Sequence, residues 1–395
     1  MKDKVVLAFS GGLDTSFCVK YLTNEKQLDV FSVTVNTGGF SENELVEIER
    51  KALSLGVVSH KSIDVTQEYY HKCIRYLIYG NILKNNTYPL SVSSERAYQA
   101  MAVLNYAKQL NAKFVAHGST GAGNDQVRFD AVFNILAPEI EIITPIRDLK
   151  LSRNAEIEYL KKNGVESDWK KAEYSINKGL WGTSIGGKET LTSNQTIPET
   201  AYPSQLIENK SSEIEIGFLC GEPCSISGKE YENKVDLILD LEQIASKYAI
   251  GRDMHIGDTI IGIKGRVAFE AAAAILIIKA HHTLEKHTLT KWQQYWKQQL
   301  AEWYGMFLHE AQYLEPVMQN IEKFLKETQK NVTGKVIVRL SPYRFQIIGI
   351  NSEHDLMNSK FAQYGEMNTS FSGEDVKGFT KIMTNQMKIY HKING

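Results

Sequence analysis

Seven residues near the start of the chain combine flexibility with polar groups suited to binding a ligand. They follow the apolar run Val5–Phe9 and read Ser10-Gly-Gly-Leu-Asp14-Thr-Ser16. The two glycines allow a sharp turn and a close approach of backbone N–H groups, and a helix that starts here points its positive end at the same place. This combination favours an anion such as phosphate. Because Asp14 would repel bare phosphate, it indicates a Mg²⁺ ion between the carboxylate and the phosphates.

A second polar segment runs from His117 to Arg128. It reads His117-Gly-Ser-Thr-Gly-Ala-Gly-Asn-Asp-Gln-Val-Arg128. A helix capped by Asn124 would explain that asparagine. It would not explain the three glycines and the threonine before it, so this segment is also predicted to bind a ligand.

Two other phosphate-binding motifs fit the chain less well. The nearest match to G-x-x-x-x-G-K-[ST] begins at Gly182, but it has Glu189 in the last position and no strand is expected before it. No G-x-G-x-x-G follows Phe9, which disfavours a dinucleotide-binding Rossmann enzyme.

The elements that would position the two segments alternate between strands and helices. Predicted strands are Val5–Phe9, Val30–Val35, Val57–Val65 and Lys113–Ala116, and predicted helices are Thr15–Leu22, Glu42–Leu55 and Glu95–Leu110. This alternation is typical of βαβ units in a parallel sheet, which binds ligands at the carboxyl ends of its strands. We therefore expect an α/β nucleotide-binding domain at residues 1–165.

The pattern changes after Gly164, where we expect an α+β domain at 166–365 and a C-terminal helical arm at 366–395. Ser175–Leu206 is rich in small and polar residues and is predicted to be a long functional loop. Further expected elements are strands at Glu213–Leu219, Val235–Asp240 and Ile260–Lys264, helices at Phe269–Ala280 and Trp292–His309, a hairpin at Lys335–Ile350 and an amphipathic helix at Asp375–Ile393.

The composition is that of an ordinary globular protein. The chain has 395 residues and a net charge of −1, so no global basic field indicates nucleic acid or an anionic membrane as a partner. Four cysteines are too few for a disulfide scaffold and suit a reducing compartment. The longest apolar run, Ala271–Ile278, is too short to span a bilayer. We therefore expect a cytoplasmic protein.

The first loop resembles that of the pyrophosphatase-loop enzymes, which cleave ATP between its α and β phosphates. Within that group, the string HGSTGAGNDQVRF resembles HG-x-TGKGNDQVRF of the argininosuccinate synthase family, with Ala122 where the family often has Lys. Tyr88–Arg96, Tyr174–Ser184 and Ile250–Glu270 resemble the family's YLLGTSLAR, YSIDENLWGRS and GxGR…G-x-K-x-R…YE stretches. The resemblance covers most of the chain, from Lys4 to about Lys279.

The resemblance implies a fold and a reaction. The fold is an N-terminal domain like the adenine nucleotide α-hydrolases, with a parallel sheet, followed by a C-terminal α+β synthetase domain and a C-terminal helix. The reaction joins citrulline to aspartate in arginine biosynthesis, consumes ATP with Mg²⁺, and releases AMP and pyrophosphate through a citrullyl-adenylate. The implied assembly is a homotetramer. No side-chain nucleophile is needed, so catalysis would depend on positioning and electrostatics.

The resemblance also implies roles for individual residues. Catalysis is expected to depend on Ser10, Asp14 and Asp125, with Asp14 as the residue that meets Mg²⁺ through the phosphates. ATP is expected at Ala8, Ser10, Gly11, Gly12, Asp14, Thr15, Ser16, Val35, His117 and Gly118. Aspartate is expected at Thr120, Asn124 and Asp125, and citrulline at Tyr88, Ser93, Asn124, Arg128, Ser175 and Ser184.

Four residues depart from the family pattern near the amino-acid end of citrulline. Gly257 replaces the acidic residue that meets the α-ammonium, Phe269 replaces a tyrosine, and Asn177-Lys178 replaces Asp-Glu. On one interpretation, Asp258 or Asp253 binds the α-ammonium in place of the missing acidic residue. On the other, the α-nitrogen is acylated, for example by acetyl or succinyl, because an unpaired buried ammonium is costly. Lys178 would then suit a second carboxylate.

Two alternatives from other function classes remain open at this point. A tRNA-thiolating pyrophosphatase-loop enzyme would use sulfur-carrying cysteines, but Cys220 and Cys224 form the only close pair. A non-enzymatic nucleotide-binding module would not need the long second half. His281 and His282 are predicted to pack in the core rather than bind metal, and Trp292, Trp296 and Trp303 to pack or form a subunit contact.

Overall fold

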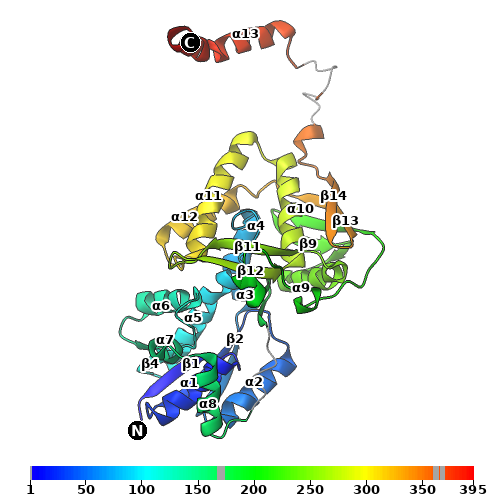
Figure 1. Ribbon diagram of the computed structural model, residues 1–395. Coiled ribbons are helices and arrows are strands. Elements are labelled where there is room, and N and C mark those ends of the chain that lie inside the picture. The colour runs from blue at the N-terminus through cyan, green and yellow to red at the C-terminus, as the bar shows by residue number, and fades with distance from the viewer. Residues whose placement is uncertain (1, 167–173, 359–363, 365–369) are drawn as a thin grey trace.

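The computed structural model describes residues 2–166, 174–358, 364 and 370–395. It contains a parallel sheet near the N-terminus and two antiparallel sheets in the second half of the chain. Figure 1 shows the two parts one above the other, with the N-terminal part in blue and cyan. The expected boundary at 365 lies outside the described residues, and the division at 165 stays a prediction.

The N-terminal sheet has the order β3-β2-β1-β4-β5, and all its neighbouring strands are parallel. Its strands are β1 (Lys4–Ala8), β2 (Asp29–Asn36), β3 (Ser59–Asp64), β4 (Phe114–Ala116) and β5 (Glu141–Ile143). Its helices are α1 (Leu13–Asn24), α2 (Glu42–Ser54), α3 (Thr66–Tyr69), η1 (Tyr70–Ile74), α4 (Arg75–Tyr79), α5 (Ser91–Gln109), α6 (Asp125–Leu136), α7 (Pro145–Leu149) and α8 (Arg153–Lys162). Each strand and helix predicted here from the sequence is present within a few residues.

Helices cover both faces of this sheet because the central strand is apolar on both sides. Val5 and Leu7 of β1 belong to one buried cluster together with Phe17 of α1 and Leu160 of α8. Val6, which points the other way, belongs to a second cluster with residues of α5. An unbroken apolar strand covered on both faces is typical of parallel sheets.

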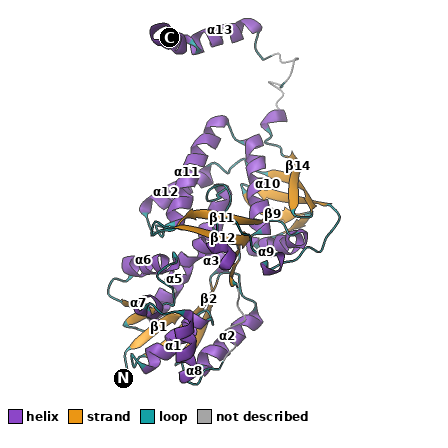
Figure 2. Ribbon diagram, viewed as in Figure 1, coloured by secondary structure: helices purple, strands orange, loops and turns teal. Residues whose placement is uncertain are grey.

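The second half of the chain contains two antiparallel sheets. The first has the order β10-β9-β8-β13-β14 and the second β11-β12-β7-β6. The strands are β6 (Ser175–Gly179), β7 (Gly182–Gly186), β8 (Ser212–Leu219), β9 (Glu222–Ile226), β10 (Lys229–Glu230), β11 (Arg252–Asp258), β12 (Lys264–Glu270), β13 (Gly334–Ser341) and β14 (Arg344–Asn351). The helices are η3 (Lys188–Leu191), η4 (Glu199–Ala201), α9 (Lys234–Ala245), η5 (Ser246–Tyr248), α10 (Ala272–Thr288), α11 (Lys291–His309), α12 (Pro316–Glu327), η6 (Leu356–Asn358), α13 (Gly373–Met383) and α14 (Asn385–Asn394). Figure 2 shows α9, α10, α11 and α12 packed around the strands.

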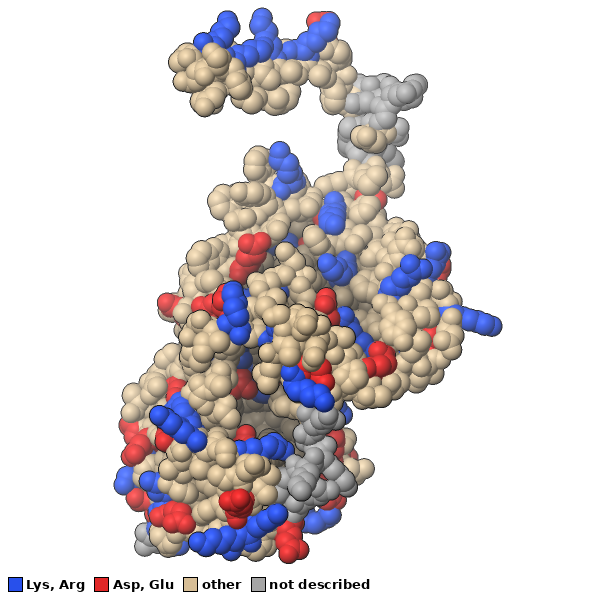
Figure 3. All heavy atoms as spheres, in the orientation of Figure 1, with Lys and Arg blue, Asp and Glu red and all other residues tan. Residues whose placement is uncertain are grey.

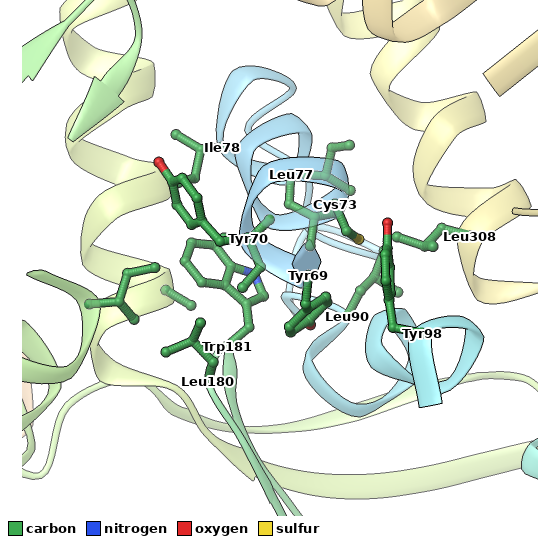
Figure 4. Close-up of a cluster of buried hydrophobic side chains, with 14 of the residues drawn as sticks. Tyr69, Tyr70, Cys73, Leu77, Ile78, Leu90, Tyr98, Leu180, Trp181 and Leu308 are labelled. Atoms are coloured by element: carbon green, nitrogen blue, oxygen red, sulfur yellow. The ribbon is translucent and has the colours of Figure 1, made fainter. Parts of the chain in front are cut away.

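A shared aromatic core joins the two halves. Figure 4 shows Tyr69 of the N-terminal part between Trp181, which lies in the turn between β6 and β7, and Tyr98, with Leu308 of α11 next to Tyr98. These four side chains are almost completely buried. The hairpin β6–β7 is therefore held rigidly beside α5.

The structure corrects four predictions for the second half. Val235–Asp240 is helical, because Val235, Ile238 and Leu241 are buried at helical spacing and the Asn233 side chain caps the helix by accepting from the Val235 N–H. A short apolar run by itself does not distinguish a helix from a strand.

The other three corrections concern β-hairpins. The predicted strand Ile260–Lys264 is mostly the turn between β11 and β12, and the predicted helix Phe269–Ala280 starts only at Ala272 because β12 continues to Glu270. The predicted loop Ser175–Leu206 contains the hairpin β6–β7. The expected helix in the tail is present as α13 and α14, which bury no residue and stand apart from the rest in Figure 1.

Candidate functional site

The loop after β1 is held in a tight turn at the carboxyl end of the sheet. Gly11 has φ of +75°, which favours glycine. The Gly12 carbonyl accepts from the Ser16 hydroxyl at 2.7 Å and from the Ser16 N–H at 3.0 Å, which locks the loop onto the first turn of α1. The N-terminal end of this helix, with its free N–H groups, therefore faces the open edge of the sheet and can attract an anion.

A pair of carboxyl groups lies at the same helix end. Asp14 is in the first turn of α1, and Glu156 of α8 is buried. Burial and the neighbouring Asp14 carboxylate raise the pKa of Glu156 to about 8, so Glu156 is mostly protonated at neutral pH. Its Oε2 atom is buried and has no hydrogen-bond partner. A hard divalent cation such as Mg²⁺ would favour loss of this proton, after which both carboxylates could be ligands.

The second segment packs directly against the first because β1 and β4 are neighbours in the sheet. A Cβ atom at Gly118 would lie 3.3 Å from Thr15 Cγ2 and 3.4 Å from Asp14 Cβ. Glycine therefore lets the loop after β4 touch the first turn of α1. The residues predicted to hold ATP on the two segments thus lie together, with Ala8 and Val35 at or next to the carboxyl ends of β1 and β2.

The buried His117 side chain holds this second loop in place. Its Nδ1 accepts from the Ser119 N–H at 3.3 Å, so Nε2 carries the proton and donates to Asp130 Oδ1 at 2.9 Å. Asp130 also accepts from Arg147 at 2.6 Å. Thr120, predicted to bind aspartate, is exposed at the tip of the loop. The Asn124 side chain does not cap the helix, because its Oδ1 accepts from the Ile260 N–H at 2.9 Å and so reaches the β11–β12 turn.

Asp125 lies between two buried arginines. Its carboxylate accepts from Arg96 Nε at 2.9 Å and from Arg128 Nη1 at 3.0 Å. Burial would raise the pKa of Asp125, but the two guanidinium groups outweigh it and lower the pKa to about 2. Arg128, predicted to bind the carboxylate of citrulline, also donates from Nε and Nη2 to the His309 carbonyl.

Sequence reasoning gave no role to Glu95 and Arg96, although both belong to this cluster. Arg96 donates to Glu95 Oε1 at 2.8 Å, and the Thr37 hydroxyl donates to Glu95 Oε2 at 2.8 Å. Burial raises the pKa of Glu95 to about 7 despite the neighbouring Arg96. An acid and a base in adjacent positions on an otherwise buried helix were the signal that could have indicated them.

Tyr88, Ser91 and Ser184 form a buried hydroxyl cluster beside this charged group. The Tyr88 hydroxyl lies 3.1 Å from Ser184 Oγ and accepts from Ser91 Oγ at 3.1 Å. Ser93 is also buried and donates to the Leu90 carbonyl at 3.4 Å. Ser175 is different, because it is exposed at the start of β6 and, in the described residues, forms no hydrogen bond with this cluster.

Other candidate sites are not supported by the described part of the chain. It contains no group of three or more His, Cys, Asp or Glu side chains that could hold a metal ion. His281 is buried between Asn81 and Gln329, which contact its two ring nitrogens at 2.6 and 2.8 Å. Lys178 is exposed and acts on Glu44 of α2, so nothing here places it at the citrulline end. None of the described helices is long and apolar enough to cross a membrane.

The visible surface fits a small-molecule site. Figure 3 shows that the molecule is hollowed where its two parts meet, and that basic and acidic residues are interspersed on this face rather than gathered into a basic patch. The two loops, Asp125 and the hydroxyl cluster come from elements that meet at this junction.

Comparison with known proteins agrees with the resemblance noted from the motifs. The model of the arginosuccinate synthase N-terminal HUP domain matches residues 4–166, and that of the arginosuccinate synthase C-terminal domain matches residues 174–390. The argininosuccinate synthase of Dictyoglomus turgidum is 39% identical over 98% of both chains. That of Methanocaldococcus jannaschii is 37% identical over 99% of this chain and 98% of its own. The predicted fold class is confirmed, and the chain belongs to the argininosuccinate synthase family.

Proposed function

We propose that this chain is an ATP-dependent carbon–nitrogen ligase that joins a citrulline-type ureido group to aspartate and releases AMP and pyrophosphate. The observation that carries the proposal is the contact of Gly118 with Asp14 and Thr15. It brings the two glycine-rich segments together at one helix N-terminus, at the carboxyl ends of adjacent parallel strands. The family membership of the whole chain supports the same reaction.

The phosphates of ATP would bind at Ser10–Ser16, and the remainder of the nucleotide at Ala8, Val35, His117 and Gly118. The backbone N–H groups of the loop and the positive end of α1 would stabilise the charge that develops on pyrophosphate. Asp14, with Glu156 beside it, would hold Mg²⁺, which supplies further charge stabilisation when bound. Ser10 would contribute its hydroxyl, which now lies 3.3 Å from the Thr15 hydroxyl.

The two amino-acid substrates would bind on the other side of the second loop. We propose Thr120, Asn124 and Asp125 for aspartate, with the Asp125 carboxylate accepting from its ammonium group before the amine is deprotonated. We propose Tyr88, Ser93, Asn124, Arg128 and Ser184 for the ureido substrate. We propose Ser175 for the same substrate, since its exposed side chain at the start of β6 is free to meet a ligand from solution.

The chemistry follows from holding three substrates in fixed positions. The ureido oxygen is first converted to a good leaving group by bonding to the α-phosphorus, with pyrophosphate departing. The aspartate nitrogen then bonds to the ureido carbon as the bond from that carbon to the AMP oxygen breaks. The chain supplies orientation and a fixed electrostatic environment, and no covalent bond to a side chain is required.

Isotope labelling tests the proposal directly. ATP labelled at its α-phosphorus, mixed with aspartate, a citrulline-type substrate and the protein, should yield labelled AMP with one pyrophosphate per condensation. Labelled ADP with orthophosphate instead of pyrophosphate would reject the proposal.

We further propose a homotetramer that works in the cytoplasm. Helix α11 exposes Trp292, Tyr295, Trp296 and Trp303, each more than half exposed. Helices α13 and α14 bury no residue, although Phe379, Ile382 and Ile393 among others are apolar. Exposed faces with several large apolar side chains are normally covered by a partner. Sedimentation equilibrium of the full chain against a chain ending at 365 tests this assembly.

A further inference from the structure

The strand β11 presents two different faces, and only one of them points to the ureido site. Side chains alternate along a strand, so Asp253, His255 and Gly257 share one face, and Ile256 and Asp258 share the other. His255 lies on the side of Tyr88, with ring centroids 5.3 Å apart and nearly parallel. Asp258 cannot replace an acid at Gly257, because it lies on the other face and forms an ion pair with Lys264 at 2.6 Å.

Gly257 has no room for an acidic side chain in the present arrangement. A Cβ atom there would lie 2.8 Å from His255 Nε2 and 3.4 Å from Asn85 Nδ2. The His255 imidazole therefore occupies the space next to the position at which the family places a carboxylate.

Near Gly257 lie a basic side chain and two imidazoles that each have a nitrogen without a hydrogen-bond partner. His255 and His309 are each only 6% exposed, and the Nδ1 atom of each is buried without a hydrogen-bond partner. Burial lowers the pKa of both imidazoles, and Lys84 lowers both further. For His309 the pKa falls to about 3, with Arg128 and His255 also contributing. Both imidazoles are therefore neutral and can each donate one hydrogen bond.

Lys84 is held next to the hydroxyl cluster by its backbone. Its N–H donates to the Tyr88 carbonyl at 2.7 Å, and its carbonyl accepts from the Tyr88 N–H at 3.1 Å. Its ammonium forms no ion pair with a carboxylate in the described part of the chain. The side chain is half-buried. The carboxylate that its charge is shown to influence on β11 is Asp258, whose pKa it helps to lower after the larger effect of Lys264.

The charges disfavour a free ammonium at this end of the ureido substrate. An α-ammonium would meet Lys84 and Arg128, which repel it, and would find only Asp253 on the same strand face. Asp253 is exposed, and one of its oxygens already accepts from the Met254 N–H at 2.7 Å. An amide nitrogen carries no charge and avoids this cost. A carboxylate, in contrast, would gain Lys84 and two imidazole donors.

Two aromatic rings pack together next to His255. The Phe269 ring lies 5.5 Å from the Tyr88 ring and is 1% exposed. The Tyr88 ring thus packs against both Phe269 and His255, which lie on the neighbouring strands β12 and β11.

We propose that the ureido substrate carries on its α-nitrogen an acyl group ending in a carboxylate, and that Lys84, His255 and His309 bind this carboxylate. The inference rests on the proposed function and names the substrate class of the same site. The acyl group takes no part in bond formation, so the condensation proceeds as described above.

A panel of three substrates tests the inference on the full-length protein. Free citrulline, N-acetyl-citrulline and N-succinyl-citrulline are each supplied with ATP, Mg²⁺ and aspartate, and AMP release is measured. We expect kcat/KM for the succinyl compound to exceed that for free citrulline about 100-fold and that for the acetyl compound about 10-fold, since charge-assisted hydrogen bonds discriminate at this level. Equal or better use of free citrulline, or equal use of the acetyl and succinyl compounds, would overturn the inference.

The variant Lys84→Gln separates binding of the acyl carboxylate from general effects. It should lower kcat/KM about 10- to 100-fold for the succinyl compound and less than about 3-fold for the acetyl compound. Lys335→Gln, which removes a charge on the distant strand β13 where the lysine pairs with Glu215, should change neither. An equal effect of Lys84→Gln on both compounds would overturn the inference. AMP from none of the three substrates would instead reject the proposed function, and the inference with it.

Discussion

Replacing Asp125 with Asn perturbs the centre of the candidate site while keeping its shape. The aspartate oxygens accept from Arg96 and Arg128 at 2.9 and 3.0 Å. Asparagine offers one oxygen, and its NH₂ group cannot accept, so one guanidinium group loses its acceptor. The remaining hydrogen bond also loses the negative charge of its acceptor.

The expected loss of stability follows from these two contacts. A hydrogen bond to a charged group stabilises by about 1.5–3 kcal/mol and a neutral one by about 0.5–1.5 kcal/mol. Losing one of these charged bonds and weakening the other to a neutral one costs about 2.5–4.5 kcal/mol before solvent screening. Because 35% of the Asp125 side chain is exposed, solvent screening reduces the expected loss to about 1–2 kcal/mol. On the proposed function, the KM for aspartate should also rise about 10- to 100-fold.

The pH dependence of this loss has a definite sign. Burial, with a smaller contribution from the Asp125 carboxylate, raises the pKa of Glu95 to about 7. The free energy of unfolding of the wild type therefore falls as the pH rises from the usual pKa of a glutamate through 7. Without Asp125 the pKa of Glu95 is lower, and this fall is smaller. The deficit of Asp125→Asn relative to wild type should therefore be larger at pH 5 than at pH 8.

Urea unfolding at pH 5 and pH 8 measures the loss of stability and its pH dependence. Steady-state kinetics measure the KM for aspartate. Asp240→Asn is the matched control, because Asp240 pairs with Lys229 at 2.6 Å and accepts from the Tyr231 hydroxyl at 2.7 Å close to the surface, where an ion pair contributes little. A deficit for Asp125→Asn no larger than that control, or one that grows with pH, would refute the reasoning.

Three further predictions concern Asp14, Glu156 and Gly257. Asp14→Asn should keep the circular dichroism spectrum and reduce AMP release by orders of magnitude, and near-normal turnover would contradict the role of the loop. Glu156→Gln should melt with the wild type at pH 5 but at a higher temperature above pH 8. The reason is that burial and Asp14 raise the pKa of Glu156 to about 8, so its ionisation destabilises the folded wild type as pH rises through that value. A melting temperature of Glu156→Gln below that of the wild type at pH 9 would contradict this prediction. Gly257→Glu and Gly257→Ala both displace His255, but only Glu adds a carboxylate, so its KM for free citrulline should be about 10-fold lower than that of the alanine variant. Equal values would mean that the ammonium is not bound there.

The sequence by itself determined the local features of the first domain. Val5, Val6 and Leu7 form an unbroken apolar strand, and the glycines of Ser10–Ser16 allow a tight turn before a helix. Both are consequences of neighbouring residues. For the same reason the motif after His117 was sufficient to indicate the family, which the comparison over the whole chain confirmed.

Local pattern was insufficient wherever tertiary packing selects between helix and strand. Val235–Asp240 is an apolar run that fits either, and it is helical because one face packs in the core and Asn233 caps its start. Phe269 continues a strand, although the alanines after it favour a helix, because β12 pairs with both β11 and β7.

The meeting of distant side chains was decided only by the tertiary structure. Asp258 was a candidate to replace the acid missing at Gly257, but a shift of one residue along a strand moves a side chain to the opposite face. Lys84, His255 and His309 are widely separated in the chain, and the common role proposed for them depends on the fold, which brings Lys84 and His255 near enough to lower the pKa of His309. Sequence spacing does not encode such a contact, since it depends on how whole elements pack against each other.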